Sequence, residues 1–308
     1  MSVLFYSQGD DPKPWRIAFA MAFPKMPFHV WPDVTDTESV RYALAWNPPS
    51  GLLKKCPNLQ AVLSLGAGVD GFLSDQTIPD VPIVRLLDAG LAPQMAEYAV
   101  YAVLHFHRGM PGYQAQQARS EWRPRAPVPA RQWVVGVMGT GIIGGLIANN
   151  LVTLGYTVRG WSRTEKRIAG VESFAGDDQL GAFLSGSRVV INALPLTDKT
   201  TGILGARIFM SMPRGSYVVN IGRGAHLIED DLLTALESGH IAGAMLDVFN
   251  EEPLPVAHPF WSHPRVIVTP HIAGVTIASE AEAQVIANVR RIEQGEQPVG
   301  VVDPGKGY

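Results

Sequence analysis

The chain has 308 residues, of which 46% are hydrophobic and 17% charged, a globular composition that excludes a largely disordered protein. A single hydrophobic core usually stops growing near this length, so two domains are expected. The formal net charge of −3 gives no electrostatic reason to expect a nucleic acid or a membrane surface as partner.

Cysteine content and the N-terminal sequence bear on the compartment. Cys56 is the single cysteine, so no intramolecular disulfide can form, which fits a reducing compartment. The N-terminus lacks the basic and apolar regions of a secretory signal, and no apolar run reaches the roughly 18 residues that a membrane span needs. We therefore expect a cytoplasmic protein.

In the N-terminal third, short apolar runs rich in β-branched residues alternate with segments of helical period. Such alternation predicts parallel strands joined by helices, as in a small doubly wound domain. The expected strands cover residues 3–6, 28–31, 42–46, 59–65 and 83–85. A long helix is expected next, at 93–107, and a Pro-rich stretch at 122–129 follows it as a connector or surface arm.

A second series of alternating elements starts at Trp133. Its expected strands cover residues 134–138, 157–161, 189–193, 217–221, 242–248 and 266–268. Six such runs match a dinucleotide-binding sheet. An amphipathic helix at about 277–294 comes too late for that sheet and is expected to pack on the first domain. The expected domains are therefore 1–99 with 275–308, for substrate, and 100–274, for dinucleotide.

A glycine-rich turn directly follows the strand at 134–138. It consists of Gly139, Thr140, Gly141, Ile142, Ile143 and Gly144. Glycines let the backbone turn tightly and approach a pyrophosphate, which then lies at a helix N-terminus. The motif alone is weak, but here a strand precedes it, a helix follows, and a second strand comes about twenty residues later. We interpret it as a dinucleotide site in preference to a structural turn.

The second strand of this unit ends in Ser162 and Arg163, with no acid before Glu165. An NAD site normally has a carboxylate here for the ribose 2′-hydroxyl, whereas an arginine can bind a 2′-phosphate. NADP(H) is therefore the preferred cofactor, with NAD as a second option. The alternative is a solvated basic turn that discriminates poorly between the two.

Three single residues at expected strand ends could assist hydride transfer to a 2-oxo acid by binding its carboxylate and supplying a proton. Arg223, between two glycines, could bind a carboxylate with its guanidinium fork, unless it is an ordinary surface arginine. His271 could exchange the proton, although a histidine in a turn is more often structural. A carboxylate beside it would fix its tautomer, and by chemistry alone Glu252 and Glu251 both qualify.

From about residue 45 to 276, these motifs together resemble the D-2-hydroxyacid dehydrogenase family, most closely its glyoxylate/hydroxypyruvate reductase branch. The resemblance implies a Rossmann domain inserted in a flavodoxin-like substrate domain. It makes Arg223 the catalytic arginine, Glu252 the partner acid and His271 the acid/base, and it puts Asp247 on the nicotinamide carboxamide. The further cofactor positions that it implies are Leu194, Pro195, Ile221, Gly222 and Gly274, with Arg223 and His271.

The resemblance also assigns substrate residues in the first domain. The loop Gly66, Ala67, Gly68 and Val69 follows a strand, so its amides could form an anion nest that shares the carboxylate with Arg223. Trp46 would line the pocket, unless it simply packs in the core. The arm with Trp122 would embrace a second subunit in a homodimer. NADPH would then reduce glyoxylate or hydroxypyruvate to the D-hydroxy acid, with the proton coming from His271.

Other features carry no site in this interpretation. Cys56 has no catalytic context, His105 and His107 do not share a helix face, and His258 and His263 are assigned to loop packing, so no metal is expected. Two rival functions stay open. One is a nucleotide-sensing regulator or corepressor without turnover. The other is a formate dehydrogenase-like enzyme, a branch associated with extra length that this chain lacks.

Overall fold

The computed structural model describes residues 1–303 and 305. The chain forms two compact units, the first made of Met1–Gly90 and the residues from Thr276 on, the second of Leu91–Val275. The first crossing therefore lies at Gly90, not after residue 99, because helix α3 (Leu91–His107) belongs as a whole to the second unit. Ala96, Ala99 and Val103 of this helix pack into the core of that unit.

The first unit is built on a five-stranded parallel sheet in the order β2-β1-β3-β4-β5, the flavodoxin-like order. Its strands are β1 (Ser2–Tyr6), β2 (Phe28–Val30), β3 (Val40–Ala45), β4 (Ala61–Ser64) and β5 (Ile83–Val84). Its helices are α1 (Pro12–Ala22), α2 (Asp70–Ser74) and α9 (Ala278–Glu293).

Alternation along the strands supplies a core on each face of this sheet. Val3 and Phe5 pack with α1 and α9 on one face, and Leu4 packs on the other with Cys56 and Phe72. A strand buried on both faces reads as a continuous apolar run, as β1 does. The doubly wound architecture that the sequence predicts for this unit is confirmed.

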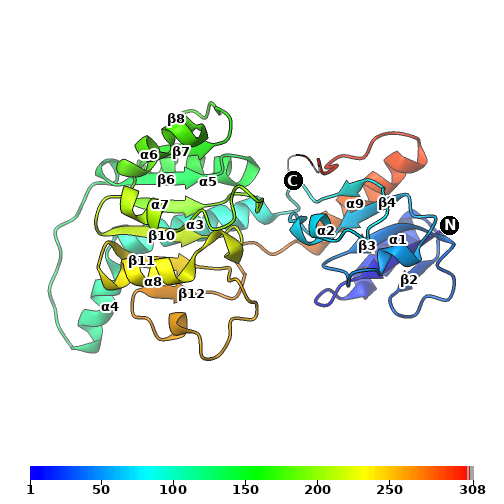
Figure 1. Cartoon of the computed structure of the whole chain (residues 1–308), viewed down its shortest axis with the longest axis horizontal. Coiled ribbons are helices and arrows are strands. Elements are labelled where there is room, and N and C mark those ends of the chain that lie inside the picture. Colours follow the sequence, from blue (N-terminus) through cyan, green and yellow to red (C-terminus); the bar gives the residue numbers. More distant parts are fainter. Residues whose placement is uncertain (304, 306–308) are drawn as a thin grey trace. The chain divides into compact units, whose positions relative to one another are not determined.

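The second unit is built on a seven-stranded parallel sheet in the order β12-β11-β10-β9-β6-β7-β8 (Figure 1). Its strands are β6 (Val134–Met138), β7 (Thr157–Ser162), β8 (Val171–Ala175), β9 (Val189–Asn192), β10 (Ser216–Asn220), β11 (Ile241–Leu246) and β12 (Val266–Val268). Its helices besides α3 are α4 (Met110–Ala118), α5 (Ile142–Thr153), α6 (Gly176–Ser185), α7 (Ala206–Ser211) and α8 (Glu229–Glu237).

Strand order decides where a ligand can bind in this unit. From β6 the chain moves outward through β7 and β8, then returns to β9 on the other side of β6 and moves outward again. Such a reversal opens a crevice at the carboxyl ends of the central strands. The glycine turn follows β6, and the segments holding Leu194, Arg223, Asp247 and His271 follow β9, β10, β11 and β12. The topology therefore gathers these residues at the carboxyl ends of the strands of this sheet.

One strand and one helix of this unit were not expected from the sequence. The edge strand β8 mixes polar and apolar residues, and none of its five residues is fully buried. Helix α4 buries none of its residues and leads into the Pro-rich arm, which extends away from the sheet in Figure 1. Within the described residues, no helix is long and apolar enough to cross a membrane.

Candidate functional site

The glycine turn after β6 has the geometry that a pyrophosphate needs. Gly139 has a φ of 92°, in the left-handed region. A Cβ on Gly144 would lie 1.8 Å from the carbonyl oxygen of Gly139, so only glycine fits, whereas a Cβ on Gly141 would meet nothing within 4 Å. Helix α5 starts directly afterwards, and no side chain of the described residues caps its N-terminus. These residues fit a dinucleotide phosphate on the helix N-terminus.

The hydroxyl of Ser162 is engaged inside its own turn. It donates to the carbonyl of Thr164 at 2.7 Å and accepts from the hydroxyl of Thr140 at 3.0 Å. Its proton is thus used within the protein. Of the two predicted residues, Arg163 is the one with charge to offer a 2′-phosphate, and the nearby acid Glu165 pairs with Arg167 at 3.8 Å.

Two buried asparagines hold the loops after β9 and β10. Asn192 accepts from the amide of Leu194 at 3.3 Å and donates to the Asn220 side chain at 2.9 Å. Asn220 in turn accepts from the amide of Gly222 at 3.2 Å and donates to the carbonyl of Arg223 at 3.0 Å. The backbone around Arg223 is thereby held in place by buried side-chain hydrogen bonds. Sequence reasoning missed this pair, although a polar residue ending an apolar strand could have signalled it.

Close backbone packing explains the glycine after Arg223. A Cβ on Gly224 would lie 1.8 Å from the carbonyl carbon of Phe249, so the loop with Arg223 lies directly against the loop that leads to Glu252. The guanidinium of Arg223 donates to the carbonyl of Gly222 at 2.8 Å. Its charge also reaches Glu252, where it helps to lower the pKa of the carboxyl.

His271 and Glu252 form a hydrogen-bonded pair. Nδ1 of His271 lies 2.8 Å from Oε2 of Glu252, while Oε1 of Glu252 accepts from the amide of Phe249 at 2.9 Å. Burial raises the pKa of Glu252, but the hydrogen bonds from His271 and Phe249 and the charges of His271 and Arg223 together bring it below its ordinary value. An ionised Glu252 accepts the proton on Nδ1, which leaves Nε2 as the ring nitrogen for proton exchange. The structure thus selects Glu252 over Glu251 as the partner of this histidine.

Asp247 organises the loop that carries His271. Its side chain is 1% exposed and accepts three hydrogen bonds, from the Thr269 hydroxyl at 2.6 Å and the amides of Ile272 and Ala273 at 2.9 and 2.8 Å. The amide of His271 donates to the Asp247 carbonyl at 2.8 Å. These bonds hold His271 at a φ of 54°, a conformation that few side chains adopt. The contact of Asp247 with a nicotinamide stays a prediction.

In the first unit, two predicted substrate elements lie together. The Trp46 ring covers Gly66, where a Cβ would come within 2.3 Å of the ring. The amide of Gly66 donates to the hydroxyl of Ser64 at 3.2 Å, so it is already engaged. In the described chain, the amides of Ala67, Gly68 and Val69 make no such bond, and these three are the candidates for an anion.

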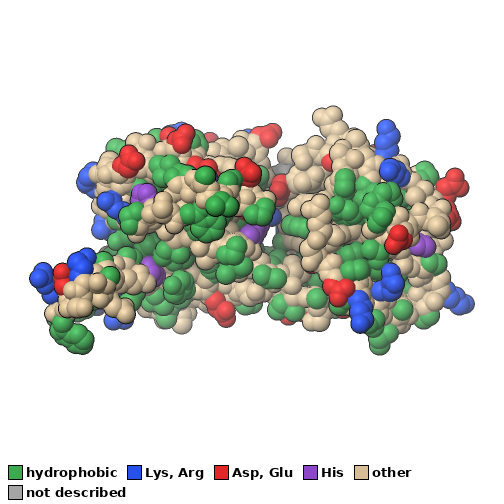
Figure 2. Space-filling view, turned by 90° about the horizontal axis from the view of Figure 1, so that it is seen from below, with side chains coloured by type: hydrophobic (Ala, Val, Ile, Leu, Met, Phe, Trp, Pro, Cys, Tyr) green, Lys and Arg blue, Asp and Glu red, His purple; other side chains and the backbone are tan. Residues whose placement is uncertain are grey.

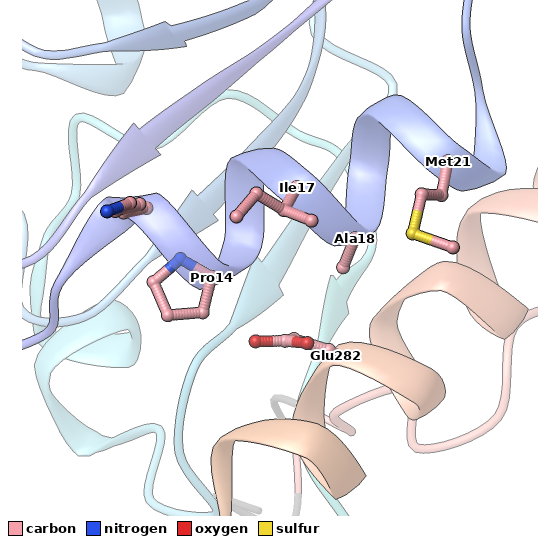
Figure 3. A pocket seen from close by; sticks show the side chains of 6 residues that line it. Pro14, Ile17, Ala18, Met21 and Glu282 are labelled. Carbon is pink, nitrogen blue, oxygen red and sulfur yellow. The ribbon is translucent and has the colours of Figure 1, made fainter.

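The other features of the described residues form no second catalytic or metal site. Burial raises the pKa of the Cys56 thiol, and His258 pairs with Glu229 at 3.2 Å. No group of metal-ligating side chains occurs among the residues described. A shallow groove of about 440 Å³ lies between α1 and α9, lined by Pro14, Ile17, Ala18 and Met21 with Glu282 opposite (Figure 3). It contains none of the predicted site residues.

Comparison with known families and proteins agrees with this geometry. Residues 100–273 match the family "D-isomer specific 2-hydroxyacid dehydrogenase, NAD binding domain". The chain is 45% identical over 314 aligned positions to glyoxylate/hydroxypyruvate reductase A of Yersinia enterocolitica, with all of both chains covered. It is 46% identical, again over all of both chains, to the enzyme of the same name from Photorhabdus laumondii.

Solved structures show the same likeness. A D-isomer specific 2-hydroxyacid dehydrogenase from Xanthobacter autotrophicus, in complex with NADPH and MES, is 41% identical with a TM-score of 0.95, over 100% of this chain and 99% of that one. An NADPH-dependent glyoxylate/hydroxypyruvate reductase from Sinorhizobium meliloti, in complex with NADP and sulfate, is 34% identical with a TM-score of 0.93, over 100% of both chains.

Proposed function

This chain belongs to the D-isomer specific 2-hydroxyacid dehydrogenase family, and we propose that it uses NADPH to reduce small 2-oxo acids, glyoxylate and hydroxypyruvate, to D-2-hydroxy acids. The observation that carries the proposal is the His271–Glu252 pair at 2.8 Å, with Arg223 one loop away at the same sheet edge as the glycine turn. Curated relatives named glyoxylate/hydroxypyruvate reductase A, aligned over their whole length, support the substrate class.

The residues divide the work in a simple way. The guanidinium of Arg223 binds the carboxylate of the 2-oxo acid and orients its carbonyl. Nε2 of His271 donates a proton to the carbonyl oxygen, and ionised Glu252 stabilises the imidazolium before transfer and fixes its tautomer. When bound, the reduced nicotinamide supplies the hydride. In the reverse direction, His271 accepts the hydroxyl proton.

Cofactor choice follows from the end of β7. The carboxylate that would bond a ribose 2′-hydroxyl is missing there, and Arg163 supplies positive charge instead. Gly139, Thr140, Gly141, Ile142, Ile143 and Gly144 would hold the pyrophosphate. Leu194, Pro195, Ile221, Gly222, Asp247 and Gly274 would line the rest of the cofactor site. In the first unit, Trp46 and residues 66–69 keep their proposed role in binding the 2-oxo acid.

The arm supports a homodimer. The Trp122 side chain is 97% exposed, although the arm around it is anchored: the amide of Arg125 donates to the Tyr113 hydroxyl at 3.0 Å. Figure 2 shows basic side chains gathered at the outer end of this arm. An exposed tryptophan on an anchored arm suits a contact with a second copy, and Trp122 could reach the neighbouring site. Sedimentation of the wild type and Trp122→Ala, with a weaker dimer in the variant, tests this assignment.

We assign the protein to the cytoplasm, without nucleic acid as a partner, on its single buried cysteine and its net charge of −3. The regulator hypothesis is separated by turnover. Initial rates of NADPH and NADH oxidation with glyoxylate, hydroxypyruvate, pyruvate and phenylpyruvate should show the two small acids with NADPH as the preferred pairs. Tight NADPH binding without turnover of any acid would instead support a regulator.

A further inference from the structure

A second histidine, His226, lies behind the proposed site and has no role in the mechanism above. It ends the short 3-10 helix Gly224–His226 and is 0% exposed. A buried imidazole is costly unless both of its nitrogens have partners. Nδ1 lies 3.0 Å from the amide nitrogen of Arg223, and Nε2 lies 3.2 Å from the carbonyl oxygen of Pro195.

The surrounding bonds determine which nitrogen carries the proton. The amide of Arg223 can only donate, so Nδ1 accepts and is unprotonated. The carbonyl of Arg223 also lies 3.1 Å from Nδ1, but Nε2 faces the carbonyl of Pro195, which can only accept a hydrogen bond, so the neutral ring needs its proton on Nε2. The proton is therefore on Nε2, which donates to Pro195. Nδ1 thus bonds the backbone of Arg223, and Nε2 bonds the backbone of Pro195.

The two partners belong to different halves of the proposed chemistry. Arg223 carries the guanidinium for the substrate carboxylate, whereas Pro195 lies in the loop after β9 that we assign to the cofactor. His226 joins these loops a second time through its own carbonyl, which accepts from the amide of Leu204 at 2.8 Å. A Cβ on Gly222 would lie 2.9 Å from Nδ1, so the ring fills the space beneath the turn.

We propose that His226 is a positioning residue whose two nitrogens act separately, Nδ1 placing Arg223 for the 2-oxo acid and Nε2 placing Pro195 for the dinucleotide. The proposal rests on the proposed function for the identity of both ligands. It makes a specific claim, that each half of the imidazole can be removed with loss of affinity for one ligand only.

Two substitutions separate the halves. In His226→Asn the amide oxygen can replace Nδ1 as acceptor, but nothing reaches Pro195. In His226→Gln the terminal amide can reach Pro195, but nothing replaces Nδ1. We expect His226→Asn to raise KM for NADPH by about twofold to tenfold, the effect of one hydrogen bond, with KM for glyoxylate nearly unchanged. His226→Gln should show the reverse.

Binding without turnover supplies the second readout. The dissociation constant of NADPH is measured by fluorescence titration, and oxalate, an inert dicarboxylate, is titrated against the protein with NADP⁺ by thermal shift. His240→Gln is the matched control, because Nε2 of His240 also bonds a backbone carbonyl, that of Met212 at 3.1 Å, near the amino end of β11. Equal effects of both variants on both ligands, or no effect of either, would overturn the proposal.

A measurement on the wild-type protein tests the proposal even if the variants do not fold. A histidine ¹H–¹⁵N spectrum should show His226 in the Nε2–H tautomer, with Nε2 responding mainly to NADP⁺ and Nδ1 mainly to oxalate. A ring protonated on Nδ1, or one that responds to neither ligand, would contradict the proposal. Failure of the proposed function looks different: the wild type would bind NADPH and not turn over any 2-oxo acid, while the tautomer would be unaffected.

Discussion

Nδ1 of His271 lies 2.8 Å from Oε2 of Glu252, and the two side chains are 41% and 36% exposed. The pair is thus set in place yet open to a ligand. Glu252 is held on its other oxygen by the amide of Phe249, and the loop of His271 is held by Asp247. Because both groups are fixed before a ligand arrives, the protein does not have to order them during the reaction.

Removing the charge of Glu252 should impair proton transfer. The neutral amide of Glu252→Gln cannot stabilise an imidazolium, so we expect kcat/KM for glyoxylate to fall by about 100-fold at neutral pH. The dissociation constant of NADPH should change little. Glu251→Gln is the matched control. Glu251 is the exposed neighbouring acid, and within the described residues it makes no hydrogen bond to His271. An equal loss in both variants would argue against the pair.

The same substitution should change how stability depends on pH. The pKa of Glu252 in the folded protein is lowered from 4.5, so its ionised form stabilises the fold above that pH, and this contribution is lost as the pH falls through the folded pKa. The wild type should therefore exceed Glu252→Gln in free energy of unfolding at pH 7, by a margin that shrinks toward pH 3. Urea unfolding at a series of pH values measures it. A margin that grows in acid would contradict the assigned shift.

Arg163 should control the choice of cofactor. Arg163→Ser removes the charge proposed to bind the 2′-phosphate, so kcat/KM for NADPH should fall about tenfold or more while the value for NADH stays nearly constant. Arg167→Ser is a useful control, since the Arg167 side chain is 94% exposed and pairs only at 3.8 Å with Glu165. If Arg167→Ser had the larger effect, the phosphate contact would belong to the later part of this turn.

Cys56 should be chemically silent in the folded protein. It is 1% exposed, and burial raises the pKa of its thiol, so little thiolate is accessible at neutral pH. We expect Ellman's reagent to react with one thiol per chain in denaturant and with almost none under native conditions, with no loss of turnover. Rapid inactivation of the native protein by the reagent would show that the thiol is accessible.

Much of the fold could be predicted because buried parallel strands are nearly continuous apolar runs. Strand β6 and the glycine turn after it appear in the sequence as they do in the structure. Strand β8 does not, because an edge strand needs no apolar face and its pattern resembles a loop. The first domain boundary was expected after residue 99 but lies at Gly90, because the sequence of α3 does not show which unit this helix packs on.

The site residues could be predicted by type and position, but their supports could not. His271 and Glu252 are far enough apart in sequence that only the likeness to a family joins them before a structure is seen. Asn192 and Asn220 each end an apolar strand, which is a local signal, but the sequence does not show that they bond each other or that His226 reaches Pro195, because these contacts join residues about thirty positions apart. The structure also gives Asp247 a role that the sequence did not predict, because its carboxylate holds the loop of His271, while its contact with a nicotinamide stays a prediction.

The central claim is that His271 donates the proton during NADPH-dependent reduction of a 2-oxo acid. It is tested most directly by the initial rate of glyoxylate reduction with NADPH in the wild type and in His271→Ala, with the NADPH dissociation constant measured on both. We predict clear turnover in the wild type and a loss of about 100-fold or more in the variant, with NADPH bound within a few-fold of the wild type. Equal turnover in both proteins would contradict the claim.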